Sequence, residues 1–227
     1  MGLFRMARRV FYVFLVTLPL LYGGAEVAAK RLAEKSLAEN AKSHDPVATE
    51  TSASVSSPLL FGLITKKTID RVEVSANHVK LEQLLADDAT VILHGVHIDV
   101  AQSMKQSEPV ISSIDRMDVT FSLSQDEVSK LVPAGLRVQF AGQGVTNLVG
   151  PGFLVRGTLE VEGGALAFRP LTPLPKGVRN LRLPLGETVA SCIQNIEIQV
   201  GKAIITCSKD NPPTSFPGFP GKTFGSN

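Results

Sequence analysis

"IDRMDVTFSLSQDEVSKLV", residues Ile114–Val132, carries the pattern that decides the fold. Its first half alternates apolar and polar residues with a period of two, as a strand does when only one of its faces is buried. Asp118, Thr120 and Ser122 are then expected on the polar side. The residues predicted to point inward are Met117, Val119, Phe121 and Leu123.

The second half of the same stretch changes to a helical pattern. Ser124 and Glu127 have the spacing of a capping box, in which each residue bonds the backbone N–H of the other. Pro133 would end a helix that starts there. A short helix over Gln125–Val132 is therefore predicted to interrupt the sheet.

Working outward, period-two alternation recurs on both sides. Thr68–Leu81 alternates with a change of parity near Asn77-His78, which predicts a bulge, and Ala89–Val100 places Ile92, Val96 and Ile98 on one face. Three long strands in succession predict an antiparallel meander. Further strands are predicted at Leu136–Ala141, Phe153–Glu162 and Ala165–Arg169, and in a last hairpin over Ile193–Thr206. The expected class is α+β, mainly β.

The N-terminus has the pattern of an export signal. Arg5, Arg8 and Arg9 precede the apolar run Val10–Tyr22, which at 13 residues is short for the ~20 that a membrane span needs. A cleaved signal peptide and an uncleaved anchor are both compatible with this pattern. We favour the anchor, because a helix-compatible segment follows without a break. The arginines predict a cytoplasmic N-terminus and a body outside the cytoplasm.

Composition then divides the chain into five parts. They are a signal anchor or signal peptide (1–25), an amphipathic helix (26–42), a linker rich in Ser, Thr and Ala (43–54), a β-rich domain (55–208) and a Pro/Gly-rich tail (209–227). The apolar positions of the amphipathic helix are Val27, Ala28, Leu32, Leu37 and Ala41.

Charge argues against a nucleic-acid partner. Residues 1–42 hold seven basic and three acidic side chains, so residues 43–227 carry 16 basic and 18 acidic ones, a net charge of −2. A mildly acidic body without a zinc finger or a basic helix lacks the electrostatic footprint of nucleic-acid binding.

Two cysteines, Cys192 and Cys207, flank the last hairpin. In an oxidising compartment they favour a disulfide over a reactive thiol. A two-residue turn at Val200-Gly201 would place Cys192 opposite Lys209, so the bridge requires a one-residue shift of register or a bulge.

"HGVHID", residues His94–Asp99, suggests metal ligands, but strict alternation places His94 on the apolar face and His97 with Asp99 on the other. We therefore predict no metal site, with His94 as a core or cavity histidine and His97 facing solvent. No nucleophile motif, phosphate-binding glycine loop or acid–base pair stands out from the solvated charges either, so neither catalysis nor a cofactor is predicted.

The pattern of the body leaves a large aliphatic sheet face with few helices to cover it. Such a face must close on itself, pack on a second sheet or hold an apolar ligand. Periodicity does not choose between a filled core and a lipid site.

Several stretches resemble the LmeA-like phospholipid-binding proteins of the actinobacterial cell envelope. They are "AAKRLAEKSLAE", "SSPLLFGLITKKTIDRVEVSANHV", "ATVILHGVHIDV", "IDRMDVTFSLSQDEVSKLV", "GLRVQFAGQG" and "LEVEGGALAFRPL". The resemblance implies a curved antiparallel sheet wrapped around a helix, similar to tubular lipid-binding (TULIP or BPI-like) domains. It also implies a non-enzymatic phospholipid binder at the outer face of the membrane, with an envelope glycosyltransferase as a further partner. Lys66-Lys67-Thr68 replaces a glycine usual in the family.

On this hypothesis an apolar cleft takes the acyl chains and its rim takes the head group. The predicted lining residues are Leu60, Phe61, Val72, Val74, Ile92, Val96, Ile98, Met117, Val119, Phe121 and Leu123, and the head-group candidates are Lys66, Lys67 and Arg71. The alternative is a docking module with a filled core that recruits an envelope enzyme without binding lipid.

Overall fold

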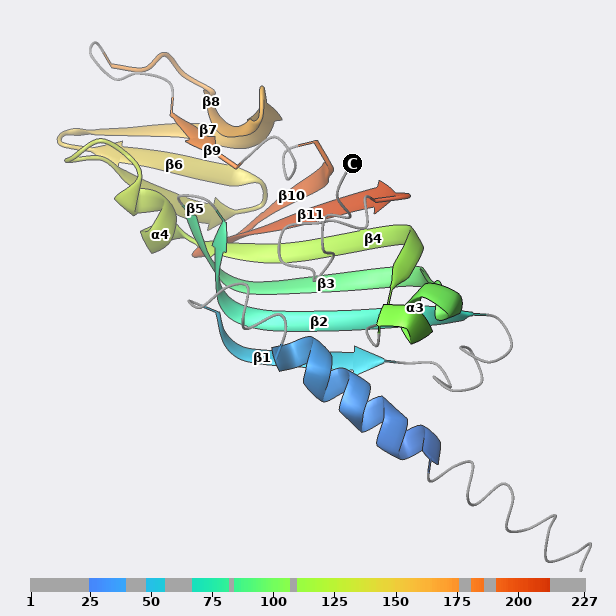
Figure 1. Ribbon diagram of the computed structural model, residues 1–227. Helices are drawn as coiled ribbons and strands as arrows, with labels where there is room; N and C mark the ends of the chain where they lie inside the picture. Colours follow the sequence, from blue (N-terminus) through green and yellow to red (C-terminus); the bar gives the residue numbers. More distant parts are fainter. Residues whose placement is uncertain are drawn as a thin grey trace, which may run out of the picture.

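The computed structural model describes residues 25–39, 48–55, 67–81, 84–106, 110–175, 181–185 and 191–212, and they form a mainly β protein (Figure 1). A helix over residues 25–39 precedes the strands. The other elements are β1 (Thr49–Val55), β2 (Thr68–Leu81), β3 (Leu84–Ile98), α3 (Val100–Gln106), β4 (Ile111–Ser124), α4 (Gln125–Lys130), β5 (Arg137–Gly142), β6 (Val145–Gly150), β7 (Phe153–Glu162), β8 (Ala165–Pro170), β9 (Arg182–Pro184), β10 (Ile193–Gln199) and β11 (Lys202–Asp210).

The strands form two antiparallel sheets. The six-stranded sheet has the order β1-β2-β3-β4-β11-β10, and the five-stranded sheet runs β5-β6-β7-β8-β9. The predicted meander is confirmed, since β2, β3 and β4 pair consecutively. Figure 1 shows β2 and β3 bending strongly at the end near β5 and α4, where the second sheet begins. A bridge between Ala141 and Val200 joins the two sheets there.

Apolar side chains on one face of the six-stranded sheet divide into two clusters. The inter-sheet core lies where the five-stranded sheet and α4 pack on it, and includes Phe121, Leu123, Val128, Phe140, Leu148, Leu166, Phe168 and Ile205. The helix-side cluster lies toward the other end and consists of Val55, Ile69, Val72, Val74, Leu93, Val96, Ile114 and Met117. The inward direction predicted for β4 is correct for both Met117 and Phe121, each 1% exposed.

Strict alternation fails in the middle of the meander. Buried positions lie three residues apart in each of three neighbouring strands, at Ile69 and Val72 in β2, Leu93 and Val96 in β3, and Ile114 and Met117 in β4. In β3 the step spans Gly95, whose φ is +59°, and a Cβ there would lie 2.0 Å from the Asp115 Oδ2 atom. Only glycine suits both the conformation and the space.

The predicted change of parity near Asn77-His78 has a similar cause. His78 has a φ of +56°, and the pairing of β2 with β3 continues in one register across it. The conformation changes the side that faces inward without the extra residue that a bulge inserts.

The capping-box spacing of Ser124 and Glu127 correctly predicted where α4 begins. Ser124 is its N-cap and accepts a hydrogen bond from the Glu127 backbone N–H at 3.4 Å, while Val128 is fully buried against both sheets. The helix is one turn with a short extension, ending at Lys130 rather than at Val132.

Several boundaries differ from the prediction. Residues 49–54, which were predicted to belong to a linker, are part of β1, which pairs with β2 at the edge of the sheet. β11 continues to Asp210, beyond residue 209, where the tail was predicted to start. α3, β6 and β9 were not predicted. Residues 1–24 lie outside the described residues, so the signal anchor is not described, and no helix within the described ranges is long and apolar enough to span a membrane.

The cysteine hairpin has the register shift that the spacing required. Gln199 pairs with Lys202 around the two-residue turn, the register slips by one between Ile193 and Asn195, and Cys192 is bonded to Cys207. Both cysteines are buried.

Replacing both cysteines with alanine is expected to lower the free energy of unfolding by about 3 kcal/mol. Without the disulfide, the loop between the two positions is no longer closed in the unfolded chain, which therefore gains conformational entropy. Denaturant unfolding of the double variant, and of the wild type with a reductant, measures the effect. An unchanged unfolding midpoint in both samples would contradict a stabilising role for the bridge.

Candidate functional site

The helix-side cluster is the candidate apolar site, and the helix of residues 25–39 lies against it. Ala29, Ala33 and Leu37 make the contact, one turn apart on a single face of that helix. The Val55 backbone N–H donates to the Glu34 Oε1 atom at 3.0 Å and ties the helix to β1. Figure 1 shows the helix beside β1, at the edge of the six-stranded sheet.

This contact face differs from the predicted one. Val27 and Leu32 are 53% and 70% exposed, so two of the side chains predicted to pack point to solvent instead. The alanines carry the contact, and the signal for them was their spacing of four residues with Leu37 rather than their hydrophobicity.

The structure brings together about half of the predicted lining residues. Val72, Val74, Val96 and Met117 belong to the helix-side cluster, and Ile98 and Val119 pack against it. Sequence reasoning missed four members of the cluster: Val55, Ile69, Leu93 and Ile114.

Other predicted lining residues lie elsewhere. Phe121 and Leu123 belong to the inter-sheet core, against the second sheet and α4. Ile92 lies opposite Glu73 in β2 and Asp118 in β4, on the polar face of the sheet, so its predicted inward direction is wrong. Leu60 and Phe61 lie outside the described residues.

The head-group candidates do not form a group. Arg71 pairs with Glu73 at 2.9 Å on the polar face of the sheet, on the opposite side from the helix-side cluster. Lys67 is exposed at the start of β2, and its carbonyl accepts from the Ile98 N–H at 2.9 Å. Lys66 lies outside the described residues.

The prediction that His94 is a core residue is wrong. Its Nε2 atom lies 3.0 Å from the Asp118 Oδ2 atom on the polar face, where its side chain is 37% exposed. Because the inward side changes at Gly95, His97 points to this face too, between Asp115 at 3.0 Å and Thr68 at 3.1 Å. The prediction that His97 is accessible to solvent holds.

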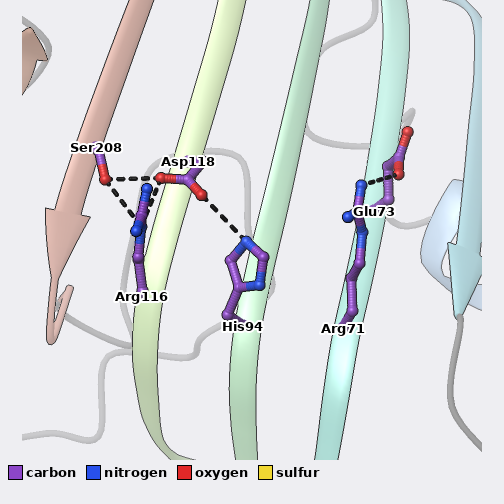
Figure 2. A network of polar contacts seen from close by, with 6 residues as sticks. All are labelled: Arg71, Glu73, His94, Arg116, Asp118 and Ser208. Carbon is purple, nitrogen blue, oxygen red and sulfur yellow. Dashed lines mark hydrogen bonds and ion pairs between the residues drawn. The ribbon is translucent and has the colours of Figure 1, made fainter.

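Figure 2 shows the polar network around Asp118, which joins three strands. The Asp118 Oδ1 atom accepts from the Ser208 hydroxyl at 2.6 Å and from the Arg116 Nε at 2.9 Å, while its Oδ2 atom meets His94. Arg116 also donates to the Ser208 hydroxyl at 3.1 Å. The network links β3, β4 and β11 on the side away from both apolar clusters.

The network does not have the order of contacts found in a nucleophilic triad. Serine, histidine and aspartate are the residue types of a nucleophilic triad, in which the serine hydroxyl bonds the histidine. Here the Asp118 carboxylate lies between Ser208 and His94, and the Ser208 hydroxyl donates to Asp118 rather than to His94. Within the described ranges no group of three or more His, Cys, Asp or Glu side chains could hold a metal ion.

Burial raises the pKa of Asp118, but the hydrogen bonds from Ser208 and Arg116, with the charges of Arg116 and His94, outweigh it and hold the pKa below its ordinary value of 3.8. A carboxylate with a lowered pKa stabilises the folded state above the unfolded-state value. That contribution is lost as the pH falls through the folded-state value.

We therefore expect the wild type to lose more stability than the Asp118→Asn variant as the pH is lowered through and below 3.8. Chemical denaturation over a pH series compares the two slopes. Equal acid sensitivity would show that this carboxylate is not coupled to folding.

A concavity with a volume of about 710 Å³ lies between α4 and β5. Its wall mixes polar and apolar side chains, and none of the predicted lipid-lining residues belongs to it. Its lining residues include Gln125, Ser129, Lys130, Arg137, Gln139 and Val149.

No protein-family model, curated protein or solved structure matches the chain.

Proposed function

We propose that this chain binds phospholipid, with an acyl chain held between the helix of residues 25–39 and the helix-side cluster. The observation that carries the proposal is the division of one continuous apolar sheet face into two unlike halves. A second sheet packs on one half, whereas the described cover of the other half is a single amphipathic helix that contributes two alanines and one leucine.

The energetics of such a site favour an aliphatic ligand. Burying acyl methylenes is worth about 0.8 kcal/mol each, so a groove lined by Val, Ile, Leu and Met side chains binds tightly without a special recognition residue. The small alanine contacts between helix and sheet give up little when a chain of methylenes replaces them. The hydrogen bond from Val55 to Glu34 keeps the helix attached at one point.

The function proposed here is binding, transfer or sensing rather than catalysis. We propose the class suggested by the resemblance to LmeA-like proteins, with a TULIP-like arrangement in which the helix of residues 25–39 packs on one face of the curved sheet. The apolar segment of residues 10–22 and the arginines before it support attachment to the outer face of the cytoplasmic membrane. An envelope glycosyltransferase is the enzyme partner that this class suggests.

A docking module without lipid is the second candidate. Its supporting observation is that Val96 and Met117 are already buried. If that closed packing is the only state, the apolar face is a filled core, and the protein acts through its surface.

Native mass spectrometry of the exported full chain, followed by lipid extraction, separates the two candidates. Phospholipid at a defined stoichiometry is expected for the binder, and the extracted class identifies the head group. A protein mass without ligand, unchanged after incubation with membrane phospholipids, would reject lipid binding and favour the docking module.

A further inference from the structure

The outer face of the five-stranded sheet carries an unusual combination of side chains. β5, β6 and β7 turn Val138, Leu148 and Val155 into the inter-sheet core, so the alternate positions face outward. Arg137, Val149 and Leu154 form one cross-strand row, and Gln139, Asn147 and Arg156 form the next. We call these six residues, with Leu171, the outer patch.

Two leucines of the outer patch are largely exposed. Leu154 is 54% exposed and Leu171 is 67% exposed. The Leu171 N–H donates to the Arg156 carbonyl at 2.8 Å, which places Leu171 beside Arg156 and continues the second row. Exposed large apolar residues that gather beside cations, rather than singly, are typical of interaction surfaces.

The arginines of the outer patch differ from most arginines of the described chain. Arg71, Arg116, Arg169 and Arg182 each pair with a carboxylate. Arg137 and Arg156 have no carboxylate within ion-pair distance among the described residues. Their charges are therefore available to an anion.

Asn147 provides an independent sign of a missing partner. It is 8% exposed, and its side-chain oxygen has no hydrogen-bond donor among the described residues. It lies between Gln139 and Arg156 in the cross-strand register. A buried amide oxygen without a donor is costly, and a ligand hydroxyl beside it would remove that cost.

We propose that the outer patch docks on the surface of an anionic phospholipid membrane, phosphatidylglycerol in particular. Leu154 and Leu171 enter the acyl boundary, Arg137 and Arg156 contact the phosphates, and a glycerol hydroxyl donates to Asn147. The groove between α4 and β5 shares Arg137, Gln139 and Val149 with the patch and gives the head group room. One carboxylate, that of Asp126, also lines this groove.

This surface is separate from the proposed acyl-chain site. Figure 1 places β6 and β7 at the end of the molecule away from the helix of residues 25–39. Docking through the outer patch does not require that the helix-side cluster hold lipid.

The chain contains no tryptophan, so the fluorescence of a single introduced tryptophan reports on the surroundings of that one position. Leu171→Trp in the full chain is mixed with vesicles of pure phosphatidylglycerol or pure phosphatidylcholine. We expect a blue shift of the emission and a several-fold loss of acrylamide quenching on phosphatidylglycerol, with a much smaller response on phosphatidylcholine. Neutralising Arg137 and Arg156 to glutamine in the same background is expected to weaken binding about fivefold for each arginine.

Val200→Trp is the matched control, because Val200 is 82% exposed on the turn between β10 and β11 and lies outside the outer patch. Contact made only by the apolar segment of residues 10–22 would give no response specific to Leu171→Trp. The proposal is overturned if the Leu171→Trp indole stays as accessible to acrylamide on vesicles as in solution, or if both indoles respond alike. Either result leaves the mass-spectrometric test of the acyl-chain site unaffected.

Discussion

Ala33→Asp is expected to reduce bound phospholipid by more than about tenfold, because the substitution places a charge between the helix of residues 25–39 and the helix-side cluster. An unpaired carboxylate in that contact must either keep its water or push the helix away from the sheet. Both outcomes remove the dry surface that acyl methylenes need. The inter-sheet core does not involve Ala33, so the β-rich body is expected to stay folded.

The matched control is Leu32→Asp, one residue away on the same helix. Leu32 is largely exposed, so its replacement adds the same charge without entering the contact. Lipid extracted per mole of folded protein, with circular dichroism as the check of folding, compares the two variants. Equal loading of both would mean that the helix-side cluster is not the lipid site.

Phe121→Ala is expected to destabilise the protein by about 3–5 kcal/mol, the usual cost of removing a buried phenyl ring from a closed core. Phe121 was predicted from the sequence to line the lipid cleft. Its position in the inter-sheet core, against the second sheet, assigns it to folding instead.

Thr120→Ala provides the comparison for that result. Thr120 is the neighbouring residue on β4, exposed on the polar face, and its loss should change the free energy of unfolding by no more than about 0.5 kcal/mol. Denaturant unfolding measures both variants. A small effect of Phe121→Ala, close to that of Thr120→Ala, would mean that the ring fills no core and would reopen its assignment to a cleft.

The parts of the fold that were predictable are those set by local chemistry. Alternation from Met117 to Leu123 predicted the strand and its inward side, and the spacing of Ser124 and Glu127 predicted the start of α4. The register conflict between the Val200-Gly201 turn and the two cysteines required an irregularity, which lies at Ile193–Asn195.

The parts that were not predictable depend on the conformation and packing that each segment adopts in the folded protein. A positive φ at Gly95 changes the inward side of β3; a glycine within a strand pattern permits such a conformation, but the pattern of "HGVHID" does not determine whether it is adopted. Strict alternation therefore placed His94 and Ile92 in the core, although both lie on the polar face.

The division of the apolar face is a second feature of this kind. Met117 and Phe121 point to the same face of β4, yet Met117 belongs to the helix-side cluster and Phe121 to the inter-sheet core. Only the position of the second sheet distinguishes them. Likewise, helical periodicity favoured Val27 and Leu32 as the packing residues, whereas the contact uses the smaller Ala29 and Ala33.

The most direct test of the central claim is to locate the acyl chain in the folded protein. A phospholipid with a photoreactive group at the end of one acyl chain would be loaded into the full chain, activated and mapped by peptide mass spectrometry. The proposal predicts adducts on the helix of residues 25–39 and on the strands that carry Val72, Val96 and Met117. Adducts confined to other surfaces, with none on these segments, would contradict it.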